Sequence, residues 1–150
     1  MIQTIEDQIE KFIQAVDEND AEKAKELLKK GLDSNYMLGN GFRLLHFAAQ
    51  SNAVNVASEL INAGAIVECP LGNIGNNTTP LHMAAVSGGT ETLELLLNSG
   101  ANPLSGGTPE STPLALSRRN GFNEAAGILE KHATQCPQTD ATIYTQSCTL

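Results

Sequence analysis

Apolar side chains recur along this chain at the spacing of amphipathic helices, and the whole arrangement returns about every 33 residues. Leu81, Ala84 and Ala85 lie three and four residues apart, so they share one face of a helix. Leu114 follows Leu81 by 33 residues and begins a similar stretch. A fixed period of this length predicts a stack of helical units, none of which can bury its apolar face alone.

Each copy of the pattern predicts two short helices joined by a tight turn. The turn position holds Asn or Gly, the residue types that best tolerate the left-handed backbone closing a helix, at Asn19, Asn52, Gly88 and Gly121. We expect the second helices at residues 21–30, 54–63, 90–99 and 123–132, and the copies themselves at about residues 6–38, 39–73, 74–106 and 107–134. The middle connection is enlarged, because His46 and His82 are 36 residues apart.

Helix starts are marked by Thr-Pro pairs. Thr79-Pro80 and Thr112-Pro113 each combine a capping hydroxyl with a proline at the first helical position, where a missing N–H costs nothing. Thr4, with Asp7 three residues later, predicts an early start for the first helix. The first copy is dense in charged residues, which suits a terminal unit whose outer face meets water.

Residues 9–132 resemble the ankyrin repeat family. The third copy matches its pattern most closely, with Thr79-Pro80-Leu81-His82, an Ala pair, Gly88 and Gly100-Ala101. The second copy departs from it at Arg43-Leu44, the fourth at Ala115 and Glu130, and the first lacks the Thr-Pro-Leu-His box. The resemblance implies an all-α solenoid of four stacked helix-turn-helix repeats with short finger loops, forming one domain over residues 1–134.

The resemblance also implies that a partner protein binds to the concave face, which is made by the finger loops and the exposed ends of the first helices. The candidate protein-binding residues are then Asp17, Glu18, Asn40, Phe42, Gln50, Ser51, Asn76, Thr78, Val86, Ser87, Thr108, Ser111, Arg119 and Asn120. Phe42 is the large aromatic residue among them and is our candidate for a binding hot spot. Packing between loops is an equally good interpretation of Phe42.

Composition and charge exclude several classes of function. The net charge of −8 argues against nucleic-acid binding, which requires clustered Lys and Arg. No stretch approaches the roughly 18 apolar residues that a membrane helix needs, and the sequence starts without a secretion signal, so we expect a cytoplasmic protein. Three widely spaced cysteines, Cys69, Cys136 and Cys148, indicate reduced thiols.

No catalytic, cofactor or metal motif stands out, and we expect a non-enzymatic chain that is monomeric when free. His46 and His82 are equivalent members of the repeat, and the resemblance implies that each imidazole bonds to the backbone of a neighbouring loop. No acidic or thiol partner recurs with them, as a metal site would require. Gly39-Asn40-Gly41 lacks the flanking pattern of a phosphate loop and predicts a finger turn.

Two further features leave alternatives open. Leu27, Asp33 and Asn35 resemble the pattern hydroxylated in ankyrin repeats by an asparaginyl hydroxylase, although a loop-closing role for Asn35 is the simpler interpretation. Residues 135–150 lack apolar periodicity and predict a flexible tail, whose end, Cys148-Thr149-Leu150, only partly matches a PDZ-type ligand.

Two functions fit this sequence. The first is an adaptor or scaffold that binds a partner protein. The alternative is an inhibitor, such as an immunity protein that neutralises a toxin, or a secreted bacterial effector that targets a host protein.

Overall fold

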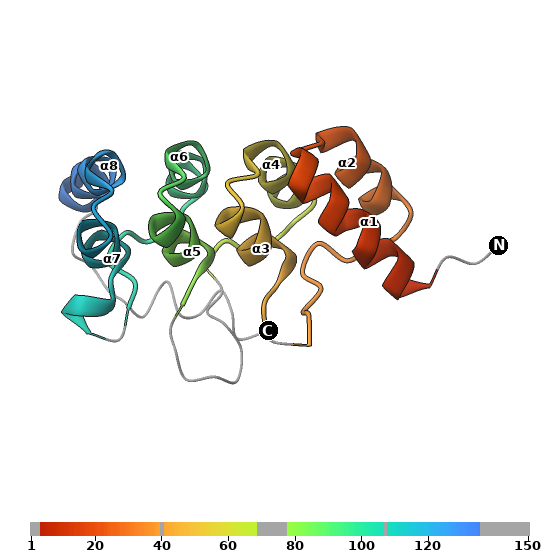
Figure 1. Cartoon of the computed structure of the whole chain (residues 1–150), viewed down its shortest axis with the longest axis horizontal. Coiled ribbons are helices and arrows are strands. Elements are labelled where there is room, and N and C mark those ends of the chain that lie inside the picture. The colour runs from red at the N-terminus through yellow and green to blue at the C-terminus, as the bar shows by residue number, and fades with distance from the viewer. Residues whose placement is uncertain (1–3, 40, 69–77, 107, 136–150) are drawn as a thin grey trace.

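Pairs of short α-helices stand side by side in a row, as the computed structural model of the chain shows (Figure 1). The structure describes residues 4–39, 41–68, 78–106 and 108–135. Within these residues the helices are α1 (Ile5–Glu18), α2 (Ala21–Lys29), α3 (Leu44–Gln50), α4 (Val54–Asn62), α5 (Pro80–Ser87), α6 (Thr90–Asn98), η1 (Pro109–Ser111), α7 (Pro113–Arg119) and α8 (Asn123–Gln135). We call α1/α2, α3/α4, α5/α6 and α7/α8 the first to fourth helix pairs.

The pairs form two layers, with α1, α3, α5 and α7 in one and α2, α4, α6 and α8 in the other (Figure 1). The loops that join one helix pair to the next project beyond the layer of first helices, on the side away from the second helices (Figure 1). The described residues hold no β-strand beyond an isolated bridge between Met37 and Arg43 in the first loop. The expected all-α solenoid is therefore confirmed.

The turn inside each pair is closed by the predicted position. Asn19 and Asn52 have φ angles of 49° and 51°, and Gly88 and Gly121 have 74° and 79°. These values lie in the left-handed region, which L-residues other than Asn and Asp rarely occupy. The Asn and Gly residues predicted to end the first helices therefore do so.

The predicted helix starts are also present. The Oγ1 atoms of Thr4 and Thr112 accept hydrogen bonds from the backbone N–H groups three residues later, each at 3.2 Å. Thr79 begins α5 in a capping box with His82, whose Nδ1 atom accepts the Thr79 N–H at 3.0 Å. Imidazole here takes the place of the usual Glu or Gln.

The core is a continuous strip between the two layers. Phe12, Leu45 and Leu81 occupy equivalent positions of the first three pairs and are almost fully buried. Small residues lie beside them and let neighbouring helices approach, at Ala15, Ala48, Ala49, Ala84 and Ala85. Each pair thus buries its apolar face against the next one, as stacked repeats require.

The second helices differ slightly from the predicted ranges. α2, α4 and α6 end one residue earlier than expected, at Lys29, Asn62 and Asn98. α8 instead continues to Gln135, three residues past the predicted end at 132, so Gln135 is helical although we placed it in the tail. α2, α4 and α6 are followed by the left-handed glycines Gly31, Gly64 and Gly100, whereas the sequence has no glycine after position 127 that could end α8 at 132. The remainder of the predicted tail, residues 136–150, lies outside the described residues.

Candidate functional site

Two columns of exposed side chains run along the ends of the first helices. They lie one and two residues before the left-handed turn of each pair, at Asp17/Glu18, Gln50/Ser51, Val86/Ser87 and Arg119/Asn120. We call these eight residues the first-helix face, and all of them are exposed. Because Leu81, Ala84 and Ala85 point α5 into the core, helical geometry turns Val86 away from it. The structure therefore brings together eight of the predicted site residues on one surface.

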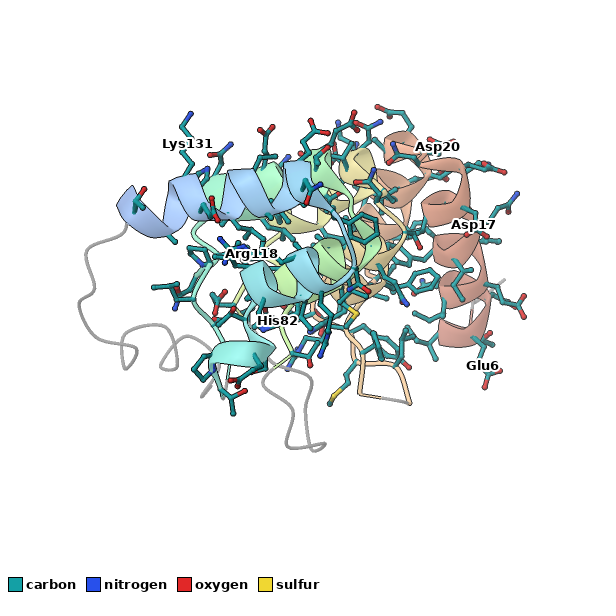
Figure 2. All side chains as sticks on the ribbon, turned by 60° about the vertical axis from the view of Figure 1, so that its left-hand side comes forward. Glu6, Asp17, Asp20, His82, Arg118 and Lys131 are labelled. Carbon is teal, nitrogen blue, oxygen red and sulfur yellow. The ribbon has the colours of Figure 1, made fainter. Side chains whose placement is uncertain are left out.

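The charge of the first-helix face changes along the stack. Asp17 and Glu18 begin it, uncharged side chains follow in the second and third pairs, and Arg119 ends it. Figure 2 labels Asp17 on α1, in the first helix pair, and Arg118, the neighbour of Arg119, on α7, in the fourth pair. The face consequently has an acidic end and a basic end.

Individual members of the face differ in how far they are already engaged. Glu18 accepts a hydrogen bond from Gln14 at 3.0 Å and pairs with Lys23, whose ammonium group lowers the pKa of the Glu18 carboxyl. Asn120 donates to the Leu116 carbonyl at 2.9 Å. These exposed interactions are weak in water and leave both side chains accessible.

Val86 supplies the apolar part of the face. Its side chain is 45% exposed, although a valine is usually buried in a folded protein. Neighbouring Ser87 turns inward, because its hydroxyl donates to the Ala84 carbonyl at 3.1 Å. An exposed aliphatic side chain flanked by polar ones is the arrangement expected at the centre of a small interface.

The loop residues of the predicted site are less uniform. Phe42 is half-buried, and its ring packs edge-on against the imidazole of His46, with 5.9 Å between the ring centroids. Thr78 presents its carbonyl oxygen to His46 Nε2 at 3.3 Å, and Thr108 and Ser111 bond to each other around η1. Asn40 and Asn76 lie outside the described residues. Phe42 therefore has a packing role, and whether it also binds a partner stays a prediction.

Two exposed apolar loop residues were not among the predicted site residues. Met37 is 49% exposed and Leu104 is 44% exposed, and both lie in the loops that follow second helices. Each stands in a short loop with glycines close by, and this position is the signal that would have pointed to them.

Asn35 closes the first loop, as its simpler interpretation predicted. Its Oδ1 atom accepts the Ile66 N–H at 2.8 Å and its Nδ2 atom donates to the Gly64 carbonyl at 3.0 Å. Glu68 forms the corresponding contact one pair further on, where its carboxylate accepts from the Asn102 N–H and the Ser105 hydroxyl, both at 2.8 Å. Burial raises the pKa of the Glu68 carboxyl. The sequence pattern had not singled out Glu68.

The two repeat histidines are structural. His46 and His82 are buried, and the Nδ1 atom of each accepts the N–H of the residue that begins its helix. Burial lowers the pKa of His82, while the backbone of Ser111 in the next loop opposes that shift. Among the described residues, no three His, Cys, Asp or Glu side chains lie close enough to hold a metal ion together.

No helix in the described part of the chain is both long and apolar enough to cross a membrane. The cysteines lie outside that part, so the prediction of reduced thiols remains untested.

Comparison with known proteins gives a consistent result. The family model described as "Ankyrin repeats (3 copies)" matches residues 12–106. The chain is 35% identical over 126 residues to the "Putative E3 ubiquitin-protein ligase XBAT35" of Arabidopsis thaliana, which covers 82% of the chain and 27% of that protein. It is 37% identical over 82 residues to Palmitoyltransferase ZDHHC13 of Homo sapiens, which covers 55% of the chain and 13% of that protein. The chain therefore spans about a quarter or less of these two relatives.

Proposed function

Because this chain belongs to the ankyrin repeat family, whose repeats are protein–protein interaction modules, we propose that it binds a partner protein through the first-helix face and acts as an adaptor or scaffold. The observation that carries the proposal is the unbroken run of exposed side chains across all four helix pairs. Core packing does not require these side chains, since all eight residues are exposed. Such a surface is available for recognition.

The chemistry of the first-helix face limits the partner. A complementary protein surface presents basic groups opposite Asp17 and Glu18, an apolar group opposite Val86, and an acidic group opposite Arg119. Opposite charges at the two ends fix the direction in which the partner lies along the stack. We expect the apolar contact at Val86 to supply affinity and the charged ends to supply orientation.

We also propose that the chain has no catalytic activity of its own. The titratable groups whose pKa values depart most clearly from normal through burial, Glu68 and His82, are occupied in holding loops together. XBAT35 and ZDHHC13 carry the names of enzymes, but this chain matches only 27% and 13% of them. Their named activities are therefore not extended to it.

Affinity capture with matched variants tests the proposal. The wild-type chain, Val86→Arg, Arg119→Glu and Glu94→Lys are used as baits in the same extract, and captured proteins are quantified by mass spectrometry. A true partner loses binding by about 1–3 kcal/mol with either face variant, the usual range for an interface contact. The same partner still binds Glu94→Lys, because Glu94 is exposed on α6, in the layer of second helices, and lies outside the first-helix face.

Circular dichroism of each bait shows that it remains folded. If both face variants capture the wild-type set of proteins while Glu94→Lys loses it, the partner uses the second-helix side and the proposal is wrong.

A further inference from the structure

The second helices of the two middle pairs lack a cap of their own. The first backbone N–H groups of a helix have no acceptor within it and depend on a side chain or water. α4 is preceded by Ala53 and α6 by Gly89, and neither residue forms a side-chain cap hydrogen bond. Their acceptors must come from elsewhere.

The preceding helix pair provides these acceptors. Asn19 Oδ1 accepts from the backbone N–H groups of Asn55 at 3.0 Å and Val56 at 3.4 Å. These are the second and third residues of α4, the two positions that an ordinary cap side chain serves.

Asn52 repeats the arrangement at α6. Its Oδ1 atom lies 3.4 Å from the Thr92 N–H and 2.8 Å from the Thr92 hydroxyl, both of which donate to it. Gly89 leaves room for this contact, because a Cβ atom there would lie 2.5 Å from Asn52 Oδ1. The lack of a side chain at position 89 therefore fits the cap.

The two asparagines occupy a conformation that favours glycine. Both have positive φ angles, and the equivalent positions of the third and fourth pairs are Gly88 and Gly121. An asparagine adopts this left-handed conformation less readily than a glycine does, but it brings a side-chain oxygen that can accept a hydrogen bond. The hydrogen bonds to the next pair give a physical reason for Asn19 and Asn52.

The fourth pair has no such connection. Gly88 offers no side chain to α8, and a Cβ atom there would lie 2.7 Å from the ring of Phe122, the residue before α8. Across this boundary the described side chains provide the Ser117 hydroxyl bond to the Ala85 carbonyl at 3.4 Å and the contact of His82 with the Ser111 backbone. The second and third pairs are additionally joined by both oxygens of Glu68.

We propose that Asn19 and Asn52 act as helix caps in trans that couple the first three helix pairs into one unit, and that the fourth pair opens separately from this unit. In a linear array, stability depends on the interfaces between neighbours, so a weaker interface defines where the array divides. The consequence for binding rests on the proposed function: Arg119 and Asn120 then move apart from the remainder of the first-helix face.

Amide hydrogen exchange followed by NMR on the free full-length chain tests the caps. In Asn19→Gly, which keeps the left-handed turn, the amides of Asn55 and Val56 exchange roughly fivefold faster, as expected for a lost N-cap. In Asn52→Gly the amide of Thr92 responds instead, so each variant serves as the control for the other. Asn19→Asp and Asn52→Asp retain the acceptor oxygen and restore protection.

Glycine also increases the freedom of the unfolded chain, but that effect accelerates all globally protected amides alike. The decisive quantity is therefore the difference in amide exchange rate between the start of α4 and the start of α6 within each variant. If the amides of Asn55, Val56 and Thr92 are each protected to the same degree in the wild type and in both glycine variants, the proposal that Asn19 and Asn52 cap the helices of the next pair is wrong.

The same experiment at increasing denaturant concentration tests the division of the stack. We expect the amides of α7 and α8 to exchange through an opening that leaves α3 to α6 protected. Exchange of all these helices in a single opening would overturn the separate fourth pair. Because no partner is present, this result is independent of whether the first-helix face binds a protein.

Discussion

His82 both caps the start of its own helix and contacts the loop of the next helix pair. Its Nδ1 atom accepts the N–H that begins α5, while the ring lies against the loop of the next pair. A neutral imidazole with an unprotonated Nδ1 is required for this arrangement, and a protonated ring would lose the acceptor. The residue type is therefore set by hydrogen bonding within the stack.

The dependence of stability on pH tests this role of His82. Burial lowers the pKa of folded His82 below its ordinary value of 6.5, so on acidification the unfolded chain binds the extra proton first. The free energy of unfolding contributed by His82 is thus present above pH 6.5 and is lost as the pH falls toward the folded pKa. Denaturant unfolding between about pH 7.5 and about pH 5.5 should show wild-type stability falling more steeply than that of His82→Gln.

Glutamine at position 82 keeps a capping-box acceptor without a titratable ring. Glu68 acts in the opposite sense, because its raised pKa makes its contribution fall as the pH rises. Its contribution is shared by the wild type and the variant, so it cancels in the comparison. Parallel pH profiles for the two proteins would show that His82 does not carry the effect.

Leu81 tests the core at the same scale. Its side chain has no exposed surface, so Leu81→Ala should lower the free energy of unfolding by about 2–5 kcal/mol. Leu104→Ala, which truncates an exposed leucine, should change it by less than about 0.5 kcal/mol. Similar losses for the two variants in denaturant titrations would contradict the assigned core.

Helices were the most predictable elements of the chain. Thr-Pro starts and Asn or Gly turns are local signals, and they located the ends of α5 and α6 to within one residue. The longer α8 was missed at its end, since no glycine follows it to close the helix. Contacts between distant segments, such as that of Asn19 with α4, leave no local signal and required the structure.

The last helix pair differs from the inner ones in a way that fits the end of a stack. Arg118 and Glu130 form an ion pair where the third pair has the buried residues Ala85 and Leu97. The side chains of Arg118 and Glu130 are 58% and 50% exposed. Because water screens an ion pair at such a site, the pair contributes at most about 1 kcal/mol to the free energy of unfolding. Its main effect is to keep an apolar surface from facing water.

Replacing Arg118 and Glu130 by the residue types of the third pair should expose an apolar surface on the fourth pair. We expect the double variant Arg118→Ala, Glu130→Leu to self-associate in sedimentation velocity at concentrations where the wild type does not, because it adds an apolar patch to the end of the stack. The exchanged variant Arg118→Glu, Glu130→Arg keeps the charges and serves as the control. An unchanged sedimentation coefficient for the double variant would show that this pair does not terminate the stack.

The whole molecule is a one-dimensional array, and its architecture could be inferred from the repeat alone. The binding surface could be inferred only in part. The resemblance to the ankyrin repeat assigned Gln50, Val86 and Arg119 to one face by their repeat positions, whereas Phe42 lies in a loop whose packing against His46 depends on three-dimensional contacts. Periodicity specifies helix faces, while loop conformations depend on their neighbours.

The chain beyond α8 gives a prediction at this scale. Residues 136–150 carry no periodic apolar pattern that could add a further unit to the array. Deleting them should shift the thermal unfolding midpoint by less than about 2 °C, as followed by circular dichroism. A larger decrease would mean that Ile143, Tyr144 or Leu150 contributes to the stability of the last pair.

Site-specific photo-crosslinking tests the central claim most directly. The photoreactive residue p-benzoyl-phenylalanine replaces Val86 on the first-helix face in one sample and Glu94 on α6 in another, and both are irradiated in the same cell extract. Both positions are exposed, so they offer equal access to a partner. The account predicts a discrete crosslinked protein from position 86 that is absent from position 94 and is reduced by Arg119→Glu. A crosslinked product from position 94 with none from position 86 would contradict it.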